Sequence, residues 1–284
     1  MPFLASSIFF AMIASARLID DPPRSAAFNM AADLHLLALC ENRPAVVVRI
    51  YTWERPSITL GMAEKPGETF DRAALAREKV EWIRRPTGGR SVLHDNDITY
   101  SCTCSSGIGG MGATLMETYK VISDCLIAGL TSAGVACTAS DSPPDSHLSR
   151  SRAKLPCFLS RNRHEIMVSG RKLVGSAQKR TAGAVLQHGS IPLTPAFMRL
   201  PDFLQLDNGQ RETQKRLLAR KCVCMQELVP DLDERTLRDC LSTGFRDTLP
   251  FPMTQSPWTE AEIAVITAVA QSEEFRKRWQ SADR

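Results

Sequence analysis

The sequence has few of the features that would place it in a specialised class of protein. It contains no internal repeat and no low-complexity tract, and its formal net charge is only +4 over 284 residues. It also lacks a helix-turn-helix extension, so we expect no nucleic-acid partner. With 43% apolar and 23% charged residues, the composition is that of a soluble globular enzyme with one large core, or a core and a small appendage.

A long apolar run of the kind that crosses a membrane is also absent. The apolar stretch over residues 3–16 is too short to span a bilayer. It ends in Ala14-Ser15-Ala16, which resembles the cleavage site of a signal peptide, but no basic residue precedes it and the first positive charge is Arg17. We therefore expect residues 1–16 to form an amino-terminal extension of a cytoplasmic protein, with secretion as the less favoured alternative.

Cysteine is present without the spacing of a metal site or a disulfide framework. The chain has nine cysteines, and an odd number in a chain of this length favours reduced thiols. The pairs Cys102-Thr103-Cys104 and Cys222-Val223-Cys224 lack zinc-type spacing, and no histidine lies near them in the sequence. We expect no bound metal.

Apolar residues recur at two different periods, which predicts an α+β fold and not a regular alternation of strands and helices. A helix is expected after Ser25, a candidate N-cap, and a long one over 115–130. Another begins at Thr259, where Glu262 completes a capping box. Short β-branched runs predict strands at 17–19, 45–53, 57–60, 80–84, 91–94, 98–104, 165–168, 172–177 and 184–191.

Residues 82–95 predict a strand that enters a tight glycine turn flanked by arginines. Gly88 and Gly89 allow positive φ angles and close backbone approach, so their amides could point at one oxygen. Arg85 and Arg90 supply positive charge for a carboxylate, a phosphate or a developing oxyanion. An ordinary hairpin turn with solvated arginines is the alternative.

A second motif combines a cysteine with a lysine. Cys157 lies at the far end of a polar loop over 139–160, and Lys172 lies in the hairpin that follows. A nearby ammonium group lowers the pKa of a thiol and favours the nucleophilic thiolate. The pair therefore suggests acyl transfer through a thioester.

Together these segments resemble the biotin and lipoate protein ligase superfamily, and within it the cysteine-dependent octanoyltransferases. Lipoate ligases usually carry a third glycine in the turn, whereas this chain has Arg90 there, as those octanoyltransferases commonly do. The resemblance covers roughly residues 17–205. It rests on Asn29 to Asp33, Ser57 to Gly61, Arg84 to His94, Asp97 to Ser101, Gly170 to Gln178, Gln187 to Ile191 and the position of Cys157.

The resemblance implies a fold and a division of the chain. We expect an acyltransferase catalytic domain of mixed β-sheets packed with helices over residues 17–205. A helical carboxy-terminal segment, residues 206–284, would pack on it.

The resemblance also implies a reaction. Cys157 would take an octanoyl group from octanoyl-acyl carrier protein, and a lysine of a lipoyl domain, such as that of the glycine cleavage H protein, would then receive it. Lys172 would hold the thiolate and stabilise the oxyanion, and no ATP or other cofactor would be needed. His94 and His188 are candidate proton carriers. The residues expected to bind substrate are Arg85, Thr87, Gly88, Gly89, Arg90, His94, Gly175, Ser176, Ala177 and His188.

Positive charge is concentrated around the proposed nucleophile. Residues 150–180 contain nine basic residues and one acidic residue, Glu165. Such a surface would steer an acidic carrier protein toward Cys157, although a solvated basic face without a partner is the alternative.

Three other functions remain open at this stage. An ATP-dependent lipoate or octanoate ligase would use Lys172 and the glycine turn to bind an acyl-adenylate, although the Arg90 side chain should crowd the phosphate-facing turn. An amidotransferase that moves lipoyl groups between carrier domains would share the cysteine and lysine chemistry. A non-catalytic module that binds acyl carrier protein would leave Cys157 without a role.

Overall fold

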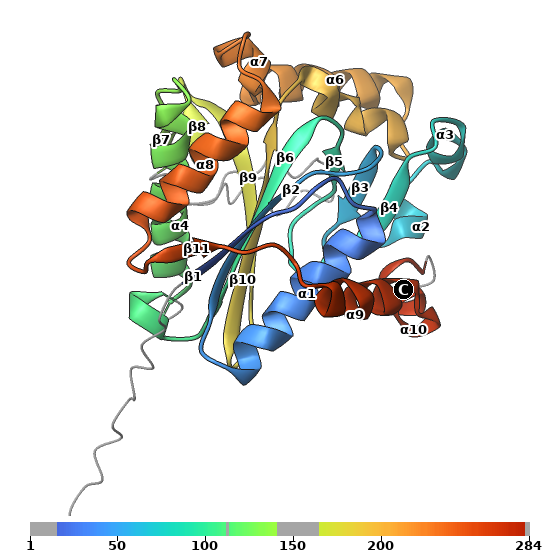
Figure 1. Cartoon of the computed structure of the whole chain (residues 1–284). Helices are drawn as coiled ribbons and strands as arrows, with labels where there is room; N and C mark the ends of the chain where they lie inside the picture. The colour runs from blue at the N-terminus through green and yellow to red at the C-terminus, as the bar shows by residue number, and fades with distance from the viewer. Residues whose placement is uncertain (1–15, 112–113, 141–164, 282–284) are drawn as a thin grey trace, which may run out of the picture.

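The computed structural model describes residues 16–111, 114–140 and 165–281. They form an eight-stranded sheet and a three-stranded sheet, with helices on both faces of the larger one (Figure 1). The order of strands is β11-β1-β2-β6-β10-β9-β8-β7 in the large sheet and β4-β3-β5 in the small one. The predicted α+β class with mixed sheets is confirmed.

The large sheet pairs β11 with β1 and β1 with β2 in parallel, and its other neighbours are antiparallel. Consecutive residues alternate between two cores. Leu18 and Val48 belong to the core beneath helices α4 (Leu115–Ser132) and α8 (Glu234–Thr248), and Ile19 and Val47 to the core beneath α1 (Ala26–Asn42). The strands are β1 (Ala16–Asp20), β2 (Val46–Tyr51), β6 (Asp97–Ser105), β7 (Thr138–Ala139), β8 (Ile166–Val168), β9 (Arg171–Arg180), β10 (Ala184–Pro192) and β11 (Met253–Gln255).

The small sheet carries the predicted glycine turn. It consists of β3 (Ser57–Leu60), β4 (Glu81–Arg84) and β5 (Val92–His94), and the turn connects β4 to β5. The short helices α2 (Pro66–Thr69) and α3 (Arg72–Arg77) and the 3-10 helix η3 (Pro195–Phe203) close its apolar side, around Phe70 and Phe203. A further 3-10 turn, η1 (Ile108–Gly110), follows β6.

The helices predicted from capping residues begin where expected. Helix α1 (Ala26–Asn42) starts after Ser25, whose side chain accepts from the Phe28 amide. Helix α4 is Leu115–Ser132, and α9 (Glu260–Gln271) begins with the Thr259 and Glu262 capping box. None of the helices in the described ranges is long and apolar enough to cross a membrane.

The carboxy-terminal segment, described to residue 281, packs on the rest of the protein and supplies a strand that the sequence did not predict. Its helices are α6 (Asn208–Lys221), α7 (Met225–Leu228), α8 (Glu234–Thr248), α9 and α10 (Glu273–Trp279). Strand β11 joins the edge of the large sheet beside β1. At the other edge, β7 pairs with β8 and reaches Ala139, the first residue of the region expected to be a loop.

Helices α4 and α8 approach closely at two glycines. A Cβ atom on Gly244 would lie 2.4 Å from the carbonyl oxygen of Cys125 and 2.4 Å from the amide nitrogen of Gly129. A Cβ atom on Gly129 would lie 2.8 Å from the Cys240 carbonyl oxygen. The neighbouring atoms belong to the backbone, so they cannot move aside without separating the helices.

We expect Gly244→Ala to lower the free energy of unfolding by about 1–3 kcal/mol, because the added methyl group overpacks the contact between α4 and α8. Gly209→Ala in α6 is the matched control, since its Cβ atom would have only the Asp207 side chain within 4 Å, at 3.4 Å. The control should not lose stability, because alanine favours a helix. Chemical denaturation of both variants measures the difference, and equal stability of the two would contradict the packing argument.

Candidate active site

A narrow pocket lies where the small sheet meets β9 and β10 of the large sheet. Its cavity volume is about 30 Å³. Six of the predicted site residues line it: Arg85, His94, Gly175, Ser176, Ala177 and His188. The other lining residues are Met30, Tyr51, Trp53, Thr59, Val92, Thr99, Gly189 and Ser190.

Arg85 holds the glycine turn together. Its guanidinium group is buried and donates to the Gly88 carbonyl at 2.7 Å, to the Arg90 carbonyl at 2.8 Å and to the Thr59 carbonyl at 3.0 Å. It also donates to the Thr87 hydroxyl at 3.1 Å. Arg85 thus lines the pocket while its charge is compensated by acceptors of the protein.

The two glycines of the turn have different roles. Gly89 has a φ angle of 94°, which other residues rarely adopt, whereas Gly88 does not have a positive φ. A Cβ atom on Gly61 would lie 1.9 Å from the Gly89 carbonyl oxygen. The turn therefore needs glycine at position 89 for its backbone conformation. It also needs glycine at position 61, directly after β3, because the Gly89 carbonyl packs against that residue.

His188 connects the turn to helix α1. Its Nδ1 lies 2.9 Å from the Asp33 carboxylate, and its Nε2 lies 2.7 Å from the Thr87 hydroxyl. Burial lowers the pKa of His188, although the hydrogen bond to Asp33 opposes this effect. A neutral His188 with its proton on Nδ1 donates to Asp33, and its Nε2 accepts from Thr87, whose oxygen accepts from Arg85.

His94 has a similar set of partners. Its Nδ1 lies 2.8 Å from the Asp97 carboxylate, and its Nε2 lies 3.0 Å from the Thr59 hydroxyl. The Trp53 ring stacks on the His94 ring with the centroids 4.1 Å apart. Ser190 donates to the same Asp97 oxygen at 2.6 Å. Both predicted histidines are thus held by a carboxylate on one side and a threonine on the other.

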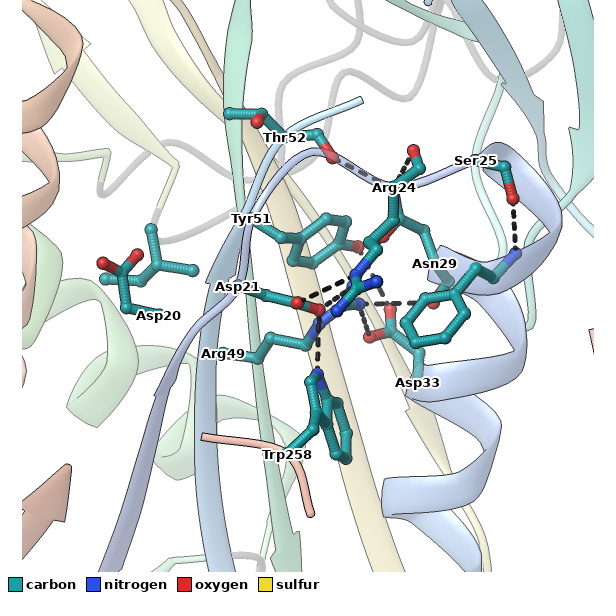
Figure 2. A network of polar contacts seen from close by, with 12 residues as sticks. Asp20, Asp21, Arg24, Ser25, Asn29, Asp33, Arg49, Tyr51, Thr52 and Trp258 are labelled. Atoms are coloured by element: carbon teal, nitrogen blue, oxygen red, sulfur yellow. Dashed lines mark hydrogen bonds and ion pairs between the residues drawn. The ribbon is translucent and has the colours of Figure 1, made fainter. Parts of the chain in front are cut away.

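A buried network of charges continues from Asp33 into the core (Figure 2). Arg49 lies in the middle of β2 with no exposed surface, and it donates to Asp21 at 2.9 Å and to Asn29 at 2.5 Å. Its Nη1 lies 3.4 Å from Asp33. The indole of Trp258, in the carboxy-terminal segment, donates to Asp21 at 2.8 Å.

The sequence prediction did not assign these carboxylates, although two signals pointed to them. Arg49 interrupts an otherwise apolar strand, and a buried charge requires partners. Asn29 and Asp33 are one turn apart in an apolar helix, so they share a face. Both lie within the Asn29 to Asp33 segment, which carried part of the family resemblance without a stated role.

Lys172 lies on the face of β9 that leads to the pocket. Consecutive residues of β8 pair with Val174 and Lys172, so β9 bulges at Leu173. Leu173 and Val174 both enter the core beneath α4 and α8. Lys172 and the pocket residue Gly175 therefore lie on the opposite face. The Lys172 ammonium group is buried and donates to Glu165 Oε1 at 2.6 Å.

Cys157 lies outside the described residues, as do all residues from 141 to 164. The eight cysteines that the structure describes are free thiols. Burial raises the pKa of Cys40, Cys104, Cys125 and Cys222 to about 12, and that of Cys137 to about 11. A thiol with such a pKa is a poor nucleophile at neutral pH.

The basic region over 150–180 is described only from residue 165. Within this part, Lys172 pairs with Glu165, and Arg171 pairs with Glu227 at 2.8 Å.

A wider groove of about 830 Å³ lies between the segment 62–65 and α10, and none of the predicted site residues lines it.

The chain is similar to known proteins over most of its length. A family model for the lipoyl protein ligase A/B catalytic domain matches residues 25–246. The chain is 35% identical over 280 residues to the octanoyltransferase LipM of Kyrpidia tusciae, covering 92% of this chain and 98% of that protein. It is 32% identical over 272 residues to the octanoyltransferase LipM of Bacillus subtilis, covering 93% and 96%.

Solved structures with the same fold include lipoate ligases. A bi-partite lipoate protein ligase from Thermoplasma acidophilum superimposes with a TM-score of 0.73 at 19% identity, covering 93% of this chain and 96% of that chain. A lipoate-protein ligase A bound with ATP superimposes with a TM-score of 0.71 at 20% identity, covering 92% and 98%. At this identity the likeness shows the fold.

We expect Asp33→Asn to lower the free energy of unfolding by about 3 kcal/mol or more, because it removes a carboxylate from a buried ion pair and leaves Arg49 with less compensation. The matched control is Asp202→Asn, which removes a half-exposed pair with Lys215 and should cost less than about 1 kcal/mol. Urea denaturation measures the free energy of unfolding of both variants. Equal losses would contradict the argument that removing a partner from the buried network costs more than removing an exposed one.

His188 should make stability depend on pH. Since its pKa is lowered in the folded protein, the unfolded chain binds a proton in a range below about pH 6.5 where folded His188 does not. Stability should therefore fall as the pH decreases through that range, by up to about 1.4 kcal/mol per pH unit. His188→Gln should give a flatter curve from pH 7.5 to 5.5, and parallel curves for the two proteins would contradict the assignment.

Proposed function

The chain belongs to the lipoyl protein ligase A/B catalytic-domain family, and we propose that it moves an octanoyl group from acyl carrier protein to a lysine of a lipoyl domain through a thioester on Cys157. It is an octanoyltransferase of lipoate biosynthesis, as its relatives from Kyrpidia tusciae and Bacillus subtilis are named. The observation that carries the proposal is that the glycine turn and β10 meet at one pocket, where Thr87 and His188, 101 residues apart in the sequence, are hydrogen bonded.

The reaction consists of two acyl transfers. The Cys157 thiolate attacks the thioester carbonyl carbon of octanoyl-acyl carrier protein, and the collapse of the tetrahedral intermediate expels the carrier thiolate, which takes up a proton. The neutral amine of the acceptor lysine then attacks the acyl-enzyme carbonyl. An amide forms, the amine loses a proton, and the Cys157 thiolate is released for the next cycle.

Lys172 is the group that we assign to charge stabilisation in both steps. Its ammonium group would favour the thiolate and would donate a hydrogen bond to the developing oxyanion. Glu165 supports this role because it holds the Lys172 side chain by a hydrogen bond of 2.6 Å on the face of β9 that continues to Gly175.

The pocket between the small sheet and β9 would receive the acyl chain. Gly175 and Gly189 leave its floor free of large side chains, while Val92 and Trp53 provide apolar walls. Its volume of about 30 Å³ is far below the several hundred Å³ of a typical ligand pocket, so we expect side chains to rearrange when the acyl chain enters. The amides of Gly88 and Gly89 and the side chains of Thr87, Arg90 and His94 are assigned to substrate binding at its rim.

The partners follow from this chemistry. The donor would be octanoyl-acyl carrier protein, and the acceptor a lipoyl domain such as that of the glycine cleavage H protein. A reducing compartment keeps the Cys157 thiol free of disulfides, so we place the reaction in the cytoplasm. Arg90 at the third position of the turn favours the transferase over an ATP-dependent ligase, because a side chain there should crowd a phosphate-facing turn.

Intact mass spectrometry tests the thioester directly. Mixing the protein with octanoyl-acyl carrier protein, without ATP, should add one octanoyl group that hydroxylamine removes. The adduct should be absent from Cys157→Ser and present in Cys137→Ser, which replaces a cysteine whose pKa burial raises to about 11.

Two results would overturn the proposal. If Cys157→Ser were acylated like the parent, the nucleophile would be another residue. If no adduct formed and the carrier domain were modified only with octanoate or lipoate and ATP, the protein would be a ligase. Protection by ATP in thermal unfolding would point the same way, because only a nucleotide-binding enzyme gains stability from it.

A further inference from the structure

We propose that the exposed face of α6 is the docking surface for the acidic carrier domain that donates the acyl group, an inference that rests on the proposed function. Helix α6 has five basic residues and one acidic residue, Glu212, so this helix alone has the net charge of the whole chain, +4. The basic residues are Arg211, Lys215, Arg216, Arg220 and Lys221.

Three of these charges are available to a partner. The other two are paired: Lys215 Nζ lies 2.7 Å from Asp202 Oδ1, and Arg211 Nε lies 3.9 Å from the same oxygen. Among the described residues, Arg216, Arg220 and Lys221 form no ion pair. Arg216 and Arg220 are exposed and lie one turn apart, so they share the outer face of the helix. Like charges at this spacing disfavour a helix, whereas the position of Arg220 in the last turn is favourable to the helix dipole.

The carboxy-terminal end of α6 is joined to the strand that carries Lys172. The helix ends at Lys221 with Cys222 as its C-cap, and the amide of Val223 donates to the Lys172 carbonyl at 3.0 Å. Arg171 donates to the Cys222 carbonyl at 3.4 Å. The basic end of the helix, with Arg220 and Lys221, therefore lies beside the proposed catalytic lysine.

The extent of this surface favours the donor over the acceptor. Helix α6 has 14 residues and is about 20 Å long, so its basic face begins near Lys172 and extends away from it. Figure 1 shows α6 lying across one end of the large sheet. An acceptor lysine has a short side chain and must be presented at the mouth of the site. The acyl group of acyl carrier protein is held on a long phosphopantetheine arm, so its protein body can bind along the helix while the thioester reaches the pocket.

Charge complementarity supplies the affinity for this partner. Acyl carrier proteins are acidic, and a row of unpaired basic groups accelerates the encounter with an acidic surface and orients it. The effect weakens with salt, because exposed charges are screened. A small thioester such as octanoyl-pantetheine lacks the acidic protein and should not depend on α6.

The test compares two triple variants of the full chain. Arg216→Gln/Arg220→Gln/Lys221→Gln removes three charges from α6. The control, Arg276→Gln/Lys277→Gln/Arg278→Gln, removes three exposed charges from α10, and both helices lose basic residues in their last turn. Figure 1 shows α10 at a distance from α6.

We expect the α6 variant to raise KM for octanoyl-acyl carrier protein about tenfold, with kcat unchanged and a weaker dependence on salt. Its acylation by octanoyl-pantetheine and its KM for the lipoyl-domain acceptor should match those of the parent, and the α10 variant should behave as the parent throughout. Fluorescence anisotropy with labelled octanoyl-acyl carrier protein and Cys157→Ser protein measures docking without chemistry, and the α6 changes should weaken that binding about tenfold.

Three results would overturn the inference: an unchanged KM and affinity for the donor, an equal loss in the α10 variant, or a loss confined to the acceptor. Failure of the proposed function would look different. In that case the parent would not be acylated by either thioester, while the anisotropy comparison would still decide whether α6 binds the acidic carrier.

Discussion

The fold and its pocket depend on the buried guanidinium group of Arg49. This residue lies in a strand without exposed positions, so its charge must be matched inside the protein. Asp21 supplies one partner, and Asn29 and Asp33 on α1 supply the others, which fixes that helix against the sheet. Because Asp33 also accepts from His188, the contacts continue from the core to the wall of the pocket.

A buried ion pair adds little net stability compared with apolar packing, but the loss of one partner is costly. In this chain the network fixes one arrangement of helix, sheet and glycine turn. Arg85 donates hydrogen bonds to the carbonyls of the turn, and the Thr87 hydroxyl is hydrogen bonded to His188. The proposed acyl pocket is thus held by groups that already have hydrogen-bond partners, while the proposed nucleophile, Cys157, comes from a different segment of the chain. This division suits an enzyme whose pocket binds an acyl chain and whose nucleophile must meet two carrier proteins in turn.

Much of the fold could be predicted because periodicity and capping are local. The N-cap at Ser25 and the capping box at Thr259 located two helices, and the family motifs located most of the pocket. The partners of the histidines could not be predicted in the same way. Asp33 contacts His188, which lies 155 residues away in the sequence, and no local pattern in α1 indicates such a long-range contact. Strand β11 was missed because three residues at a sheet edge are too few for an alternating pattern.

We propose that the pocket beside this network holds the acyl chain of a Cys157 thioester. A crystal structure of the octanoyl-enzyme, trapped before the acceptor is added, would show where the chain binds. The acyl carbons should lie between Gly175 and Val92, with the thioester carbonyl within hydrogen-bonding distance of the Lys172 ammonium group. An acyl chain bound elsewhere, for example in the groove between the segment 62–65 and α10, would contradict it.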